Sequence, residues 1–157
     1  MNFINFSSDA IFLTSAFIIF FAFTLYFGRG KMISLVLAYY PAILLYSSFP
    51  FAGKLMLLHG SKIEVYNRLA IFLLFLIPLS LIINKYIYSD AVFSGALNLF
   101  KNLAVSLILV ALLLVLSHNI PNFDILHNFS AQIDQLFANS TYIFYWNLAP
   151  FIALALI

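Results

Sequence analysis

The stretch that decides the fold is AIFLTSAFIIFFAFTLYF, residues 10–27, which carries no charged side chain. Thr14, Ser15 and Thr24 interrupt it, but such hydroxyls can bond back to the backbone of their own helix. A helix needs about 20 mostly apolar residues to cross the hydrocarbon core of a bilayer. Two glycines and two cations follow at once, in the sequence GRGK at 28–31. Residues 10–27 are therefore predicted to be a transmembrane helix that ends at this turn.

The composition extends this prediction to the whole chain. Of its 157 residues, 65% are hydrophobic and 8% are charged, and the mean hydropathy is +1.09. A soluble domain carries about 25% charged residues, because its surface must be wetted. We therefore predict an all-α, polytopic membrane helical bundle that forms one integral membrane domain over residues 1–157, with the lipid bilayer as its surroundings.

Composition also excludes several classes of function. A net charge of +2 is too small to indicate nucleic-acid binding. The chain has no cysteine, so it has no disulfide, thiolate metal site or cysteine nucleophile. Residues 1–8 hold no Lys or Arg and the first apolar run is long, so we do not expect a signal peptide.

Further apolar runs predict four to five spans in all. Their expected ranges are 10–27, 32–51, 69–85, 96–117 and 141–157. The last range is short, since seventeen residues at about 1.5 Å each barely cross the core. Pro41 leaves two alternatives for residues 32–51, which are a kinked span or a re-entrant hairpin that turns near the proline.

Helix length favours the kinked span, whereas the distribution of cations favours the hairpin. With five full spans and the N-terminus outside, the cytoplasmic loops hold Arg29, Lys31, Lys85 and Lys101, and the outer loops hold Lys54, Lys62 and Arg68. A hairpin would place five of these cations inside and two outside, which is the bias that orients membrane proteins.

Residues 122–139 show a different periodicity. Phe123, Leu126, Phe129, Ile133 and Phe137 recur at spacings of three and four residues, with polar side chains between them. This pattern predicts one amphipathic helix that is too polar to span and that lies at the interface or packs against the bundle.

No catalytic, cofactor or metal site is expected. His59, His118 and His127 lack the helical spacing of a metal pair, and no phosphate-binding glycine motif occurs. Without geometry, no serine, histidine and aspartate can be grouped into a catalytic triad. The sequence thus predicts that the protein is not an enzyme and binds no cofactor.

The most specific internal feature is a polar stripe on the fourth span. It consists of Ser94, Asn98, Asn102 and Ser106, spaced by four, with Lys101 beside it. The stripe either packs against another helix or lines a small polar path, because an amide facing lipid would lack a partner. The candidate partners for its two asparagines are the hydroxyls within other spans, at Thr14, Thr24, Ser47 and Ser48.

Asp9 opens the first span, Arg29-Gly30 closes it, and Ser94-Gly95-Ala96-Leu97 leads into a long apolar helix. Over residues 9–120 this layout resembles the colicin V production (CvpA-type) family of small bacterial inner-membrane proteins. The resemblance implies a bacterial cytoplasmic membrane location and a role in envelope maintenance or in export of a small peptide toxin. It carries over Asp9, Arg29 and Gly30 as motif positions without a known role, and it implies no catalytic residues.

The chain departs from that family in three respects. Lys31-Met32 replaces a longer turn of mixed charge, Gly95 stands without a second spaced glycine, and the segment 141–157 exceeds the usual four spans.

The function expected from these observations is that of a non-enzymatic scaffold or accessory factor of the cell envelope, linked to toxin export or membrane homeostasis. Its expected partners are a second copy or other membrane proteins. The alternatives are a small channel or transporter subunit with Asn98, Lys101 and Asn102 along its path, and an accessory subunit of a larger membrane complex.

Overall fold

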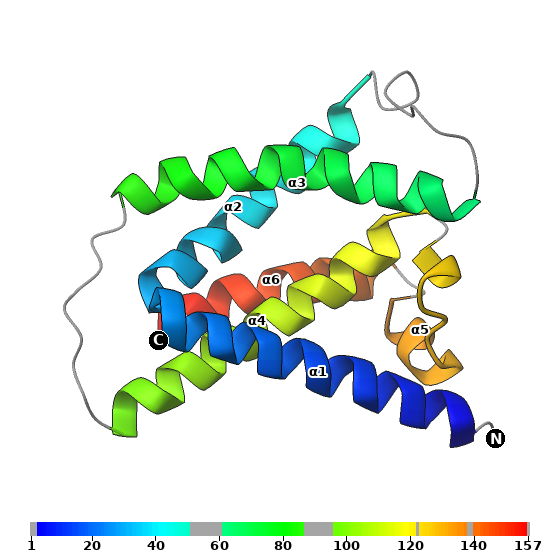
Figure 1. The fold of residues 1–157 in the computed structure, drawn as a ribbon, viewed down its shortest axis with the longest axis horizontal. Helices are drawn as coiled ribbons and strands as arrows, with labels where there is room; N and C mark the ends of the chain where they lie inside the picture. Colours follow the sequence, from blue (N-terminus) through cyan, green and yellow to red (C-terminus); the bar gives the residue numbers. More distant parts are fainter. Residues whose placement is uncertain (1–2, 51–60, 87–95, 122, 138–139, 157) are drawn as a thin grey trace.

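A computed structural model describes residues 3–50, 61–86, 96–121, 123–137 and 140–156, and this part of the chain is helical without any strand (Figure 1). The prediction of an all-α bundle is therefore confirmed. Its elements are α1 (Phe3–Phe27), α2 (Arg29–Ser48), α3 (Ser61–Tyr86), α4 (Ala96–Asn119), the 3₁₀ turn η1 (Phe123–Ile125), α5 (Ala131–Phe137) and α6 (Ser140–Leu156).

Within the described residues, four helices are long and apolar enough to cross a membrane. Their apolar parts are Ser8–Phe27, Arg29–Ser48, Lys62–Tyr86 and Asn98–Asn119, and α6 is shorter, with an apolar part at Thr141–Leu156. By length and composition these are the helices of a membrane protein. Large apolar side chains such as Ile18 and Leu81 remain exposed on the outside of the bundle, where lipid is the natural solvent.

A single glycine separates α1 from α2. Gly28 has a φ of 86°, which a side chain would strain, and its N–H donates to the carbonyl of Thr24 at 3.1 Å. This bond closes the last turn of α1, and α2 begins at the next residue. The two helices therefore meet at one end of the bundle (Figure 1).

The second predicted span is one helix, which continues past Pro41 to Ser48. The alternative of a hairpin turning at this proline is therefore wrong. Helix α2 packs most extensively on α3. The fully buried Ala38 and Ala42 of α2 are small enough to let the two backbones come close.

Helix α3 begins at Ser61 rather than at 69, because polar residues form its first turns. Arg68 donates to Glu64 through Nη2 at 2.7 Å and through Nε at 3.2 Å. These residues are four apart on one helix face, and such a pair supports the start of a helix. The predicted boundary followed hydropathy alone and so missed these turns.

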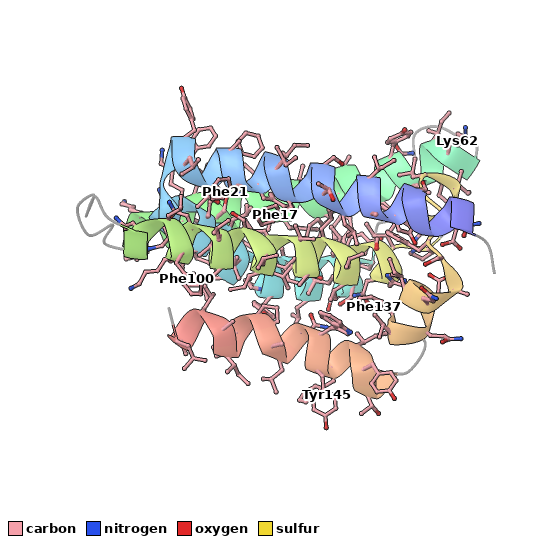
Figure 2. The ribbon with its side chains drawn as sticks, turned by 90° about the horizontal axis from the view of Figure 1, so that it is seen from below. Phe17, Phe21, Lys62, Phe100, Phe137 and Tyr145 are labelled. Carbon is pink, nitrogen blue, oxygen red and sulfur yellow. The ribbon has the colours of Figure 1, made fainter. Side chains whose placement is uncertain are left out.

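Helix α4 lies between α1 and α6 and also contacts α2 (Figure 2). Its buried side chains, including Val105, Leu112 and Val115, belong to the same apolar core as those of α2 and α3. On the outer side of α6, Tyr145 points away from the bundle (Figure 2) and is 56% exposed. Helix α4 is thus the central element that positions the others.

The predicted amphipathic helix over 122–139 is wrong as a single element. The 3₁₀ turn η1 ends at Ile125, and α5 begins only at Ala131. The break has a clear cause, because the backbone N–H of Ser130 donates to the carboxylate of Asp9 instead of to a helical carbonyl. The carbonyl of Ser130 then accepts the first hydrogen bonds of α5, from Ile133 and Asp134.

Because α2 is one continuous helix that is long enough to cross a membrane, we expect its two ends to lie on opposite sides of the membrane. The chain has no native cysteine, so Lys31→Cys and Lys62→Cys are clean single reporters at exposed sites. In sealed vesicles, an impermeant thiol reagent is expected to label one of them from outside and the other only after permeabilisation.

Tyr86→Cys serves as the matched control, because α3 carries the chain back to the end where α2 begins (Figure 1). It should label from the same side as Lys31→Cys. Labelling of residues 31 and 62 from the same side would contradict this topology.

Candidate functional site: a cluster of two His–Asp pairs

Asp9 is the most deeply buried charged residue in the described part of the chain, with 2% of its surface exposed. One carboxylate oxygen, Oδ1, lies 2.9 Å from Nε2 of His127, and Oδ2 accepts from the backbone N–H of Ser130 at 2.8 Å. Both oxygens therefore have donors. Asp9 stands on α1, whereas its partners lie between η1 and α5, so this contact ties the connecting segment to the first helix.

A second imidazole–carboxylate pair connects α4 with α5. Nε2 of His118 lies 3.3 Å from Oδ1 of Asp134. Nδ1 of the same ring lies 2.9 Å from the carbonyl oxygen of Leu114, which can only accept, so we infer that this nitrogen carries a hydrogen. The two pairs, Asp9–His127 and His118–Asp134, are called the His–Asp cluster below.

Aromatic rings join the two pairs. Phe129 meets the His127 ring edge-on at 4.7 Å and stacks on the His118 ring at 5.4 Å. Phe12 of α1 stacks on His127 at 4.5 Å, which leaves the imidazole packed between apolar surfaces. The cluster therefore combines charged groups with a hydrophobic shell.

The shell continues to the last helix through Phe137. Its ring stacks on His118 at 4.2 Å and on Trp146 of α6 at 5.5 Å. Phe137 is buried and lies between the end of α4 and α6 (Figure 2). The His–Asp cluster and its aromatic shell thus hold α1, α4, α5 and α6 together at one end of the bundle.

A serine hydroxyl lies on one imidazole of the cluster, as a Ser–His–Asp relay requires. The Ser117 hydroxyl is 3.2 Å from Nδ1 of the adjacent His118, whose Nε2 faces Asp134. This hydroxyl is buried and donates to the Leu114 carbonyl at 2.7 Å, so its hydrogen is not directed at the imidazole.

In the other pair, Asp9 contacts both the His127 ring and the backbone N–H of Ser130. The described residues also contain no group of three or more His, Cys, Asp or Glu side chains that could hold a metal ion. Each of the two pairs joins separate parts of the chain, Asp9–His127 from α1 to the segment before α5 and His118–Asp134 from α4 to α5.

The polar stripe on α4 lies toward the opposite end. Ser94 falls outside the described residues, Asn98, Lys101 and Asn102 are half-buried, and Ser106 is fully buried. The Ser106 hydroxyl lies 3.2 Å from that of Thr24 on α1 and also donates to the Asn102 carbonyl at 2.8 Å. Thr24 was one of four expected partners of the stripe, and it meets Ser106 rather than an asparagine.

The three motif positions do not come together. Asp9 lies near one end of α1, whereas Arg29 and Gly30 begin α2 at the other end (Figure 1). The Gly30 carbonyl accepts from the Ser34 hydroxyl at 2.9 Å. Nη1 of Arg29 is buried and has no hydrogen-bond partner among the described residues. Arg29 and Gly30 therefore stay motif positions of unknown role.

Sequence reasoning missed both pairs of the His–Asp cluster. It found only that His118 and His127 lack the helical spacing of a metal pair, and His59 lies outside the described residues. One signal was present, because an acid at the start of an apolar span is costly unless it is paired. That signal marks Asp9 as a residue that needs a donor, but it does not say which one.

Comparison of the chain with protein-family models, with curated proteins and with solved structures finds no match in any of the three. The resemblance to the colicin V production family therefore stays a prediction carried by Asp9, Arg29 and Gly30. The function has to be argued from the geometry of this chain itself.

Proposed function

We propose that this protein is a non-enzymatic integral membrane protein that acts as a scaffold or accessory component of a membrane assembly. The proposal rests on one observation, which is that polar side chains inside the bundle connect one helix with another. In the part of the chain that the structure describes, they pair one by one between helices. Interhelical hydrogen bonds of this kind stabilise packed membrane helices.

Three contacts away from the His–Asp cluster illustrate this use. The Thr24 and Ser106 hydroxyls join α1 to α4 at 3.2 Å. The Ser34 hydroxyl of α2 lies 3.4 Å from the Asn84 amide oxygen of α3. The Tyr40 hydroxyl of α2 donates to the Asn147 carbonyl of α6 at 2.7 Å. Every long helix is thereby fastened to another one, as expected of a rigid framework.

The outer surface supports the same proposal. Large apolar side chains stay exposed on α1, α3 and α6, among them Ile11 at 67%, Leu74 at 63% and Phe144 at 60%. These faces suit lipid, a second copy of the chain or another membrane protein. We place the protein in the bacterial cytoplasmic membrane, in envelope maintenance or toxin export, on the strength of the family resemblance.

The test separates a packing role of the polar stripe from a polar path. Replacing Ser106 by alanine is expected to lower stability in detergent by about 0.6–1.7 kcal/mol, because it removes the hydroxyl contact with Thr24 of α1. Replacing Asn98 and Asn102 by leucine removes the two amides that would line the polar path. Liposomes that hold the parent protein should show no ion flux above that of empty vesicles. Ser80→Ala is the matched control, because the Ser80 hydroxyl bonds only to the Ile77 carbonyl of its own helix.

A flux that the double asparagine variant abolishes without loss of stability would replace the scaffold proposal with the channel alternative. Assembly itself is tested by cross-linking in native membranes from single cysteines at the exposed positions Ile18 of α1 and Tyr145 of α6. A scaffold gives a discrete adduct heavier than the monomer from at least one of these faces. Monomer alone from both faces would contradict the proposal.

A further inference from the structure

Four cations lie at the end of the bundle where α1 is followed by α2. Arg29 and Lys31 stand in the first turn of α2, Lys85 stands in the last turn of α3, and Lys101 stands near the start of α4. The end of α3 and the starts of α2 and α4 all reach this end of the bundle (Figure 1). These four side chains are called the cationic end below.

Lys31 and Lys85 stand on neighbouring turns of two packed helices. The helices meet there, because the Ser34 hydroxyl of α2 lies 3.4 Å from the Asn84 amide oxygen of α3. Lys31 lies one turn before Ser34, and Lys85 directly follows Asn84. Both lysines are exposed, and the Lys31 ammonium lies 5.5 Å from the centre of the Phe27 ring of α1. The bundle therefore presents two ammonium groups together at its surface.

The helices place the cationic end at the level of the lipid headgroups. Tyr26 and Tyr86 are exposed in the last turns of α1 and α3, as aromatic side chains are where a membrane meets water. On α4, Lys101 lies about 7.5 Å beyond Ser106 along the helix axis. Ser106 is held at 3.2 Å from Thr24, near the end of α1. The long side chains of lysine and arginine extend to the headgroups from such positions.

The described part of the chain supplies no carboxylate for these cations. None of the four forms an ion pair with a described residue, whereas Arg68 is paired with Glu64 at 2.7 Å. Asp90 lies outside the described residues. The described acids stand near the starts of α1 and α3 and in η1 and α5, and they are Asp9, Glu64, Asp124 and Asp134. The positive charge of the cationic end is thus left for a partner from outside these residues.

We propose that the cationic end binds the headgroups of anionic phospholipids, with Lys31 and Lys85 in contact with the same phosphate group. Such a partner surrounds the protein at this level of the membrane, and its charge is complementary to that of the four cations. Its acyl chains would lie along α3, where Leu81 and Ile82 are exposed beside Lys85. This binding requires a membrane but does not depend on the scaffold role.

The test measures which phospholipid the full chain retains in detergent. The protein is incubated with equal amounts of dioleoyl phosphatidylglycerol and dioleoyl phosphatidylcholine, separated from unbound lipid by gel filtration, and its retained lipids are counted by mass spectrometry. The acyl chains are identical, so a preference must come from the headgroup. Each basic residue near a membrane surface contributes a factor of about five to the binding of anionic lipid. The ratio of retained phosphatidylglycerol to phosphatidylcholine should therefore exceed about five, and it should fall at high salt.

Replacing both Lys31 and Lys85 by glutamine should lower this ratio by at least about fivefold. Both side chains are exposed, so the double variant should fold. Lys62→Gln is the matched control, because Lys62 is an equally exposed lysine at the opposite end of the bundle from Phe100, the neighbour of Lys101 (Figure 2). It should leave the ratio unchanged.

Soluble glycerol phosphate separates a lipid from a free phosphate, because it carries the phosphate group without acyl chains. It should not displace phosphatidylglycerol at the same concentration. Equal retention of the two lipids by the parent protein, an unchanged ratio in the double lysine variant, or an equal loss in Lys62→Gln would each overturn the proposal. Displacement by glycerol phosphate would overturn it as well, since the partner would then be a soluble anion.

Discussion

Replacing Asp9 by alanine is expected to lower the free energy of unfolding by at least about 1–3 kcal/mol, the cost of leaving one buried donor without its acceptor. The substitution leaves the N–H of Ser130 and Nε2 of His127 without their acceptor, and Ser130 is itself buried. The loss should be larger than at any exposed polar residue, because a buried donor cannot turn to water.

The effect should also be visible locally. Ser130→Cys places a single thiol at a position that is 8% exposed. In the parent background this thiol should react slowly with a thiol reagent. In the Asp9→Ala background the segment loses its attachment to α1, and the reaction should become faster.

Asp134→Ala is the matched control for Asp9→Ala, because it removes the other acid of the His–Asp cluster. The Asp134 side chain is 50% exposed and lies 3.3 Å from His118. An exposed ion pair contributes about 0–1 kcal/mol, so this variant should remain close to the parent in stability. Equal stability losses for the two variants would show that burial of Asp9 is not what fixes the connecting segment.

The helical fold could be predicted from sequence because the bilayer leaves the chain few alternatives. Backbone groups in lipid must find their partners within a helix or a closed barrel, so an uncharged run such as residues 10–27 specifies its own structure. The same run extends into α1, which begins earlier, at Phe3. The Gly28 turn was also visible, since two glycines and two cations interrupt the apolar sequence there.

The candidate site could not be predicted, because its contacts join distant parts of the chain. Asp9 and His127 are 118 residues apart, and local periodicity says nothing about which helix ends meet. The 122–139 segment shows the same limit. Its apolar spacing marked Phe123, Phe129 and Phe137, which are indeed buried. The prediction of a single helix was wrong because the carboxylate of Asp9, far away in the sequence, binds the backbone N–H of Ser130.

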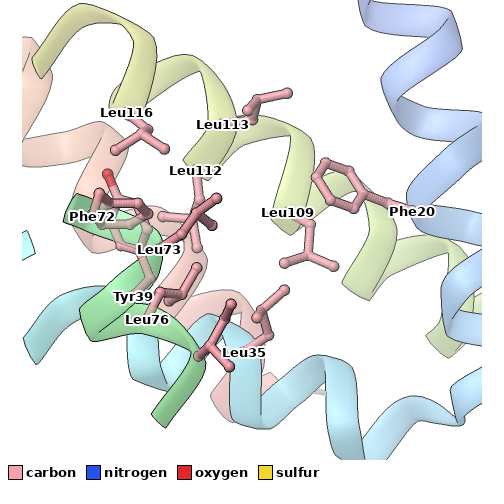
Figure 3. A pocket seen from close by; sticks show the side chains of 11 residues that line it. Phe20, Leu35, Tyr39, Phe72, Leu73, Leu76, Leu109, Leu112, Leu113 and Leu116 are labelled. Carbon is pink, nitrogen blue, oxygen red and sulfur yellow. The ribbon is translucent and has the colours of Figure 1, made fainter. Parts of the chain in front are cut away.

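Replacing Phe72 by alanine is the second change with a large expected effect. Phe72 is 1% exposed and meets the rings of Tyr39 and Tyr46 at 5.9 and 6.2 Å. Truncation removes these ring contacts and leaves a void beside the half-open apolar pocket between α1, α2, α3 and α4, which the Phe72 ring lines (Figure 3). In detergent the loss comes from the void and the missing ring contacts rather than from transfer out of water, at about 24 cal/mol per Å³ of void. It is measured as a loss of unfolding free energy.

Leu74→Ala is the control, because Leu74 lies two residues away on α3 and is 63% exposed. Lipid or detergent surrounds this side chain in the folded and unfolded states alike, so its truncation should cost little. Because Phe72 forms one wall of the pocket, added butylbenzene should bind in the enlarged space of Phe72→Ala and recover part of its stability. The same compound should not raise the stability of Leu74→Ala above that of the parent treated in the same way. Equal losses for the two variants would contradict the placement of Phe72 in the core between α2 and α3.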